Sequence, residues 1–324
     1  MIFPERVIAF CSALCCVTPA FAATATEYPS RPVRLLVPFA PGGGADTLAR
    51  IITPKLYESM GQQWVVDNRS GAAGNIAAET VARAGPDGHT VFMGFSTVLT
   101  VNPSLYKLTF DVEKDLQPVA LLATAQYILV LHPSVAAASV KDLVALLRQK
   151  PRSLNFASAG VGSPLHLAGE LFQRRAGVQM THVPYKGGGP AAAAVLSGEA
   201  QLIFASVASS MPQVKAGKLK ALATTGLKRS KVAPELPTMS EQGFAGFDVS
   251  SWYAFLVPAG TPTVIVTRLR EEAIKAVQRP DVQPVMAAQG LEVETSTPQE
   301  LAVRIRAERK TWAEVIRAAG IRAE

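Results

Sequence analysis

Short apolar runs alternate along this chain with segments whose apolar residues recur every three or four positions. The runs predict β-strands and the recurring pattern predicts amphipathic helices. Val33–Val37 is such a run, and residues 46–60 place Leu48, Ile52 and Leu56 on one helical face. Strands separated by helices predict parallel pairing and an α/β fold. Further strands are expected at residues 65–66, 90–95, 127–131, 154–157, 181–184, 201–205, 220–225 and 252–257, and further helices at residues 74–82, 139–147, 163–176 and 190–197 and after residues 261 and 297.

The length of 324 residues favours two packed units over one. We expect one lobe from residues 23–124 plus 251–324 and a second from residues 125–250, with crossings near residues 121–128 and 250–257. Two crossings make a hinge, and a hinge between α/β lobes makes a cleft.

The N-terminus has the features of a secretion signal in residues 1–22. Arg6 precedes an apolar stretch over residues 7–17, and Ala20-Phe21-Ala22 is a small-x-small cleavage site. A buried helix and a lipid anchor on Cys16 are the less favoured alternatives. All three cysteines lie in this segment, so the mature chain would have neither disulfides nor thiol chemistry.

Composition removes several classes of protein. With 48% hydrophobic residues the chain is not disordered, and outside the N-terminal segment no uncharged apolar run is long enough to span a membrane. The net charge is +7, but Lys and Arg are scattered rather than clustered, so no nucleic-acid partner is expected. These features favour an exported receptor for small anions.

A faint internal repeat is the most informative pattern. Phe39, Ala40, Gly43 and Leu48 match Phe156, Ala157, Gly160 and Leu165 at an offset of 117 residues, with Asp46 and Ser163 as corresponding candidate helix caps. Each stretch is a strand, a small-residue loop and a helix. Such a unit presents free backbone N–H groups and the positive end of a helix dipole, which bind anions. One unit per lobe would suit a dicarboxylate, although a tight packing turn is the alternative for either loop alone.

Other polar side chains follow predicted strands. Tyr185 lies in a glycine-rich loop, Ser206 follows residues 201–205, and Ser96 and Thr97 follow residues 90–95. Short hydroxyls at strand ends can bind carboxylate oxygens. Local turn bonding is an equal alternative for each of them.

Catalytic and cofactor motifs are missing from the sequence. The four histidines are far apart, no group of residues has metal-ligand spacing, and no Gly-x-Ser-x-Gly elbow or nucleotide-binding glycine motif occurs. We therefore expect no enzyme activity, no metal and no cofactor. His166 is interpreted as a packing or capping residue, and Ser163 as a helix cap.

The chain resembles the periplasmic solute receptors of tripartite tricarboxylate transporters, the Bug-type or TctC-like receptors, over essentially its whole mature length. The matching stretches are residues 28–33, 37–46, 67–75, 86–90, 182–188, 216–219, 236–238, 241–243 and 258–262. The resemblance implies a two-lobed periplasmic-binding-protein fold, type II-like, that closes over an organic anion. It also implies a ligand carboxylate at Phe39, Gly43, Gly44 and Asp46, with Ser158, Ala159, Gly162 and Ser163 opposite.

Asp46 is unusual in this set, because a carboxylate beside an anion site repels the ligand. Capping of the helix is the favoured role for it. The alternative is selection of ligands that carry an amino group.

These observations predict a periplasmic receptor that binds a mono-, di- or tricarboxylate, with amino-bearing and aromatic anions left open, and delivers it to membrane permease subunits. The expected receptor is a monomer without a nucleic-acid partner. Two alternatives remain open, an enzyme that processes organic acids in the same cleft and a sensor that presents its ligand to a signalling protein.

Overall fold

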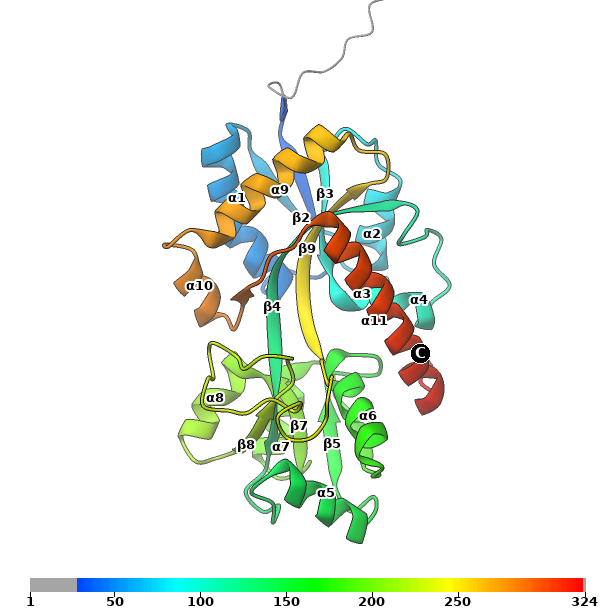
Figure 1. Cartoon of the computed structure of the whole chain (residues 1–324), viewed down its shortest axis with the longest axis vertical. Helices are drawn as coiled ribbons and strands as arrows, with labels where there is room; N and C mark the ends of the chain where they lie inside the picture. The colour runs from blue at the N-terminus through cyan, green and yellow to red at the C-terminus, as the bar shows by residue number, and fades with distance from the viewer. Residues whose placement is uncertain (1–27, 323–324) are drawn as a thin grey trace, which may run out of the picture.

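The computed structural model describes residues 28–322, which form two α/β lobes stacked along the long axis (Figure 1). The predicted signal segment lies outside these residues. The strands are β1 (Val33–Val37), β2 (Trp64–Asn68), β3 (Thr90–Phe95), β4 (Leu116–Leu131), β5 (Asn155–Ser158), β6 (Thr181–Pro184), β7 (Leu202–Ser206), β8 (Lys220–Thr224), β9 (Ser250–Pro258) and β10 (Glu292–Val293). The helices are α1 (Gly44–Met60), α2 (Asn75–Ala82), α3 (Ser96–Thr100), α4 (Asn102–Leu105), α5 (Val140–Gln149), α6 (Pro164–Ala176), α7 (Gly188–Leu196), α8 (Val207–Lys215), α9 (Thr263–Gln278), α10 (Gln283–Ala288) and α11 (Pro298–Ala319).

The strands follow the order β2-β1-β3-β9-β4-β7-β5-β6, with β8 and β10 paired to β4. Pairing is parallel between β1 and its neighbours β2 and β3, and between β5 and its neighbours β6 and β7. β9 instead runs antiparallel to both β3 and β4. The expectation of parallel pairing therefore fails for β4 and β9, the two strands that pass from one lobe to the other (Figure 1).

β4 is longer than the sequence pattern predicts. The apolar run at residues 127–131 is the end of a 16-residue strand that begins at Leu116. Its first part pairs with β9, and from Tyr127 onward it pairs with β7 and β8. Pro118, which interrupts the strand pattern in the sequence, lies at a shift in the register with β9. A proline that donates no backbone hydrogen bond is accommodated at such irregular positions.

Two apolar layers cover the first lobe, and one cluster fills the second. α1 and α9 pack on one face of the first-lobe sheet, whereas α2 and α3 pack on the other. α11 belongs to both lobes, because Leu301 and Ile305 pack in the first while Trp312 and Ile316 join the core of the second. Figure 1 shows this helix descending beside the two crossing strands toward α6. α11 is therefore a third link between the lobes.

Candidate functional site

The carboxyl ends of the parallel strands carry the predicted site residues. β1, β3, β5, β6 and β7 are each followed by a short loop or directly by a helix. In such an arrangement the N-termini of the helices, with their unpaired N–H groups, lie at the end of the sheet where ligands bind in α/β folds.

α1 begins with an open N-terminus. Its N-cap is Gly43, in extended conformation, and no side chain caps the helix. The first-turn N–H groups, beginning with Gly44, therefore have no acceptor from a capping side chain. Because α1 has 17 residues, its dipole adds to the attraction for an anion.

Asp46 does not cap the helix as the sequence favoured. It lies in the first turn and is 3% exposed. Its Oδ2 accepts a hydrogen bond of 2.9 Å from the Gly42 N–H, and both carboxylate oxygens accept from Arg50 Nε at 3.0 Å. Burial alone would raise the pKa of Asp46, but the bonds from Arg50 and Gly42 outweigh it and lower that pKa. The carboxylate therefore shapes the preceding loop instead of closing the helix end.

Phe39 lies in an aromatic row that supports this loop. Its ring meets Phe95 edge-on with centroids 5.3 Å apart, and Phe95 is 5.3 Å from the ring of Tyr253. The Phe39 carbonyl accepts a hydrogen bond of 2.9 Å from Asn68 Nδ2. The loop between β1 and α1 is thus held by side chains from three strands.

The corresponding loop of the second lobe is closed by its own side chains. Ser158 is fully buried, and its hydroxyl lies 2.7 Å from His182 Nε2 and bonds the Gly160 backbone. Ser163 caps α6 by accepting from the His166 N–H, and it donates to the Gly160 carbonyl at 2.7 Å. In the internal repeat Gly43, the N-cap of α1, matches Gly160, whereas the N-cap of α6 is Ser163. The two helix caps are therefore offset by three positions.

Two stacked histidines lie under this second loop. Their ring centroids are 3.8 Å apart and their planes differ by 7°. His166 Nδ1 accepts a hydrogen bond of 3.1 Å from the Gly162 N–H, which holds the loop between Ala159 and Ser163. Burial, followed by the proximity of His166, lowers the pKa of His182 to about 4. At neutral pH His182 is uncharged and acts as a structural support.

The remaining candidates lie in different surroundings. The Tyr185 hydroxyl donates to Glu199 Oε1 at 2.9 Å, so a residue of its own lobe already holds it. Ser206 is exposed at the start of α8, and its backbone pairs with Tyr127 of β4. No side chain caps α8.

Ser96 and Thr97 form the start of α3 on the side of the hinge that faces α11. With Pro164 and Trp312 they line a narrow gap between the lobes. The lobes also touch nearby, since a side chain at Gly162 would lie 2.8 Å from Leu105 Cδ1 of α4. The structure thus brings the loop at Gly162 against α3 and α4 of the first lobe.

Tyr253 belongs to this region but was missed by the sequence analysis. It lies on β9, 6% exposed, with its hydroxyl against Gly44 at the start of α1. A tyrosine inside an apolar strand gives no sequence signal of its own. Only the pairing of β9 between β3 and β4 puts this residue beside the first loop.

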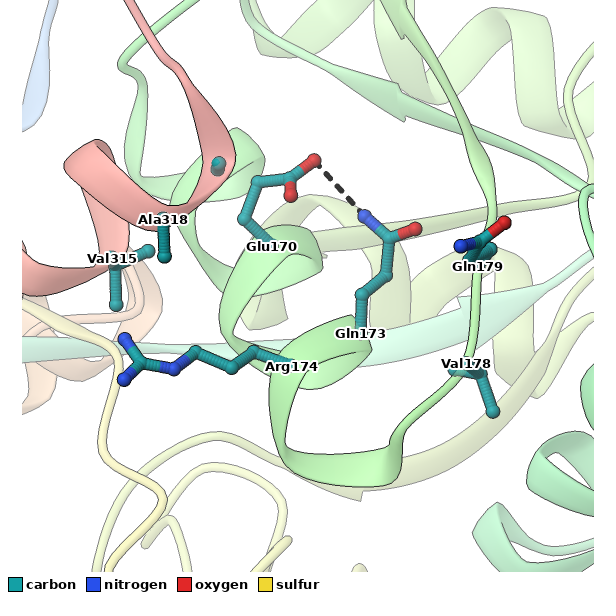
Figure 2. Close-up of a pocket in the computed structure, with 8 residues that line it drawn as sticks. Glu170, Gln173, Arg174, Val178, Gln179, Val315 and Ala318 are labelled. Carbon is teal, nitrogen blue, oxygen red and sulfur yellow. Dashed lines mark hydrogen bonds between the residues drawn. The ribbon is translucent and has the colours of Figure 1, made fainter.

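A separate hollow of about 280 Å³ lies between α6 and α11. Figure 2 shows Glu170, Gln173 and Arg174 on α6 facing it, with Val315 and Ala318 on α11 and with Val178 and Gln179 beyond α6. Gln173 donates to Glu170 at 3.0 Å. None of the candidate residues lines this hollow, so it is distinct from the predicted cleft.

Within residues 28–322, no cluster of three His, Cys, Asp or Glu side chains could hold a metal ion. Over the same residues, no helix is long and apolar enough to cross a membrane.

Residues 48–321 match the TctC family, the receptors of the tripartite tricarboxylate transporter family. The chain belongs to this family. The receptor is 36% identical to the protein BugT of Bordetella pertussis over 299 residues, which are 92% of each chain.

Two solved structures share its fold. Rpa4515 of R. palustris, determined with adipate, is 36% identical with a TM-score of 0.77, over 91% of this receptor and 99% of that chain. MatC from Rhodopseudomonas palustris, determined with bound malate, is 32% identical with a TM-score of 0.72, over 89% of this receptor and 100% of that chain.

The family confirms the predicted periplasmic-binding-protein fold and the predicted class, a periplasmic carboxylate receptor that is not an enzyme. The enzyme alternative is thereby removed.

Proposed function

We propose that this receptor binds a small dicarboxylate between its lobes and delivers it to the membrane subunits of a tripartite transporter. The observation that carries the proposal is the open N-terminus of α1, which has no side-chain cap. Malate and adipate in two relatives support a dicarboxylate as the ligand.

In this proposal the first carboxylate lies at the loop from Phe39 to Gly44, where the unpaired amides donate to it. Asp46 holds the loop through Gly42 and does not contact the ligand. The exposed Ser206 and the uncapped start of α8 are the donors for the distal part of the ligand.

The other candidates shape the cleft. Ser158, Ala159, Gly162 and Ser163 form the opposite loop, whose hydroxyls bond within the loop and to His182. Ser96 and Thr97 lie where the lobes meet, and Tyr185 lies at the rim of the second lobe. Binding stabilises the closed form only by its differential affinity for that form.

The lobes are proposed to move as residues 23–124 plus 251–324 against residues 125–250, with β4 and β9 as the hinge. α11 crosses between them, so its second half either follows the second lobe or slides on it during closure. The mature protein is proposed to begin near Ala23 after export and to act as a monomer in the periplasm.

A thermal-shift screen tests the proposal, with malate, adipate, citrate, benzoate, aspartate and glucose as probes. A ligand at one hundred times its Kd stabilises the folded receptor by about 2.7 kcal/mol. We expect a dicarboxylate to give the largest shift and glucose none. The proposal fails if glucose raises the melting temperature and no carboxylate does.

A further inference from the structure

Tyr253 lies where the hinge meets the start of α1. It occupies β9, with Phe95 of β3 opposite on one side and Ala123 of β4 on the other. Its ring is packed in the apolar layer formed with α1 and α9, and the residue is 6% exposed. The strands on either side and this apolar layer therefore fix the place of Tyr253 in the sheet.

The hydroxyl of Tyr253 touches the first turn of α1. A Cβ built on Gly44 would collide with the hydroxyl oxygen and would lie 3.1 Å from the ring carbon that carries it. The helix end and the phenol occupy the space that a side chain at position 44 would need. Gly44 is thus required by this close approach rather than by its backbone conformation.

This hydroxyl has no hydrogen-bond partner among residues 28–322. Burial and the proximity of Tyr127 raise the pKa of Tyr253, and no hydrogen bond contributes to that shift. Three other buried polar atoms in this part of the chain are sealed from solvent without a partner, Trp64 Nε1, His89 Nε2 and Ser210 Oγ. The Tyr253 hydroxyl is not one of them, so part of its surface stays accessible, and it lies against Gly44 at the start of α1.

The neighbouring polar groups are already engaged. The Tyr127 hydroxyl bonds the Ser251 hydroxyl, and the Asp46 carboxylate is held by Gly42 and Arg50. Burial raises the pKa of Tyr253 well above its usual range, which keeps the phenol protonated. The phenol and the free α1 amides can therefore all donate, and a group that satisfies several donors at once is an anionic oxygen acceptor.

We propose that the Tyr253 hydroxyl donates a hydrogen bond to the ligand carboxylate held at the N-terminus of α1 and so sets the specificity of this site for carboxylates. The inference rests on the proposed function and adds a residue of the hinge to the ligand contacts. Since β9 passes between the lobes, the contact also joins the bound carboxylate to a crossing strand.

The main test replaces Tyr253 with phenylalanine, which removes one oxygen and keeps the ring. Isothermal titration with malate, adipate and citrate measures the Kd of each. The Kd of every carboxylate that the unmodified receptor binds is expected to rise about tenfold to a hundredfold, the range for a hydrogen bond to a charged group. Tyr28→Phe is the matched control, because its hydroxyl donates to the Gly88 carbonyl away from this site.

Gly44→Ala, alone and combined with Tyr253→Phe, gives a second test that applies even if Tyr253→Phe lowers the stability of the fold. Gly44→Ala is expected to displace the phenol and to weaken binding to a similar extent. In the Tyr253→Phe background, Gly44→Ala should raise the Kd by a smaller factor than in the unmodified receptor. The reason is that the oxygen with which the new methyl group would collide is absent. A tyrosine difference absorbance on adding malate should appear in the unmodified receptor and vanish in Tyr253→Phe.

The outcomes separate the two proposals. If the receptor binds a carboxylate and Tyr253→Phe binds it with unchanged Kd, the role of Tyr253 is overturned and the proposed function stands. Full additivity of Gly44→Ala and Tyr253→Phe likewise overturns it. If the unmodified receptor binds none of the carboxylates of the thermal-shift screen, both proposals fall.

Discussion

His166 and His182 stack face to face under the second-lobe loop, with ring centroids 3.8 Å apart. Phe156 extends the stack, since its ring is 4.8 Å from that of His182. His166 Nε2 lies 3.6 Å from Glu170, and its Nδ1 accepts from Gly162. Burial in this stack disfavours a charged ring, so the loop depends on an uncharged His182.

The stack predicts a loss of stability in mild acid. The pKa of His182 is about 4 in the fold against 6.5 for the ordinary side chain. The folded state therefore binds fewer protons than the unfolded state between these values, and its stability falls as pH drops from 6.5 to 4. Allowing for solvent screening of this half-buried ring, we expect a contribution of about 1–3 kcal/mol.

Thermal unfolding from pH 4 to pH 7 measures this contribution. His182→Phe keeps an aromatic ring in the stack and should flatten the pH dependence relative to the unmodified receptor. The carboxylates with lowered pKa act equally in both proteins. His132→Gln is the control, because His132 lies outside the stack and bonds the Ser134 hydroxyl. It should leave the pH dependence of thermal unfolding unchanged. An equal slope in His182→Phe would show that folding does not lower the pKa of this histidine.

Ser163 is predicted to act through the helix rather than on the ligand. Its hydroxyl caps α6 and donates to Gly160, so Ser163→Ala should cost about 1 kcal/mol in the free energy of unfolding. Ser139→Ala is the matched control, since Ser139 caps α5 by accepting from Asp142 N–H. Urea unfolding and titration with malate compare them. A tenfold weaker malate affinity for Ser163→Ala alone would mean that Ser163 contacts the ligand.

Asp46→Asn should weaken malate and aspartate equally. The carboxylate is turned toward Gly42 and Arg50, so the change loosens the loop without removing a partner for an amino group. The ratio of the two Kd values is therefore expected to stay within about twofold, since no direct charge contact with the ligand is lost. Titration calorimetry with both ligands measures it.

Asp142→Asn is the control for Asp46→Asn. It has the same place in the first turn of α5 and accepts from the Ala138 N–H at 3.2 Å. It should lower stability slightly and leave both affinities unchanged. A selective loss of aspartate binding in Asp46→Asn would show instead that Asp46 recognises the amino group.

Trp312 is expected to hold α11 to the second lobe. It is 7% exposed within the second-lobe core, although α11 begins in the first lobe. Trp312→Ala should cost about 3–5 kcal/mol in unfolding free energy because it leaves a cavity between the lobes. Its exposed neighbour provides the control, since Thr311→Ala should stay within about 0.5 kcal/mol. Equal stabilities of the two variants would contradict a third link between the lobes.

The sequence predicted the repeated strand-loop-helix units well. β1 and β3 have the predicted bounds, and α11 begins after residue 297 as expected, with a capping box formed by Thr297 and Glu300. Such features depend on neighbouring residues alone, since periodicity and side-chain capping act over one or two turns. The helices α3, α4 and α10 were missed because four to six residues carry too little periodicity, and α8 was missed because it follows β7 with no loop between them.

What the sequence determined by itself was the family, the two α/β lobes and the glycine-rich loops at the strand ends. Tertiary structure decided which donors stay free. Ser163 turned inward to cap α6, whereas α1 kept an open start with the Tyr253 hydroxyl beside it. Gly44 and Tyr253 are neighbours only because β9 returns between β3 and β4. A contact between residues this far apart is set by strand pairing, which no local pattern encodes.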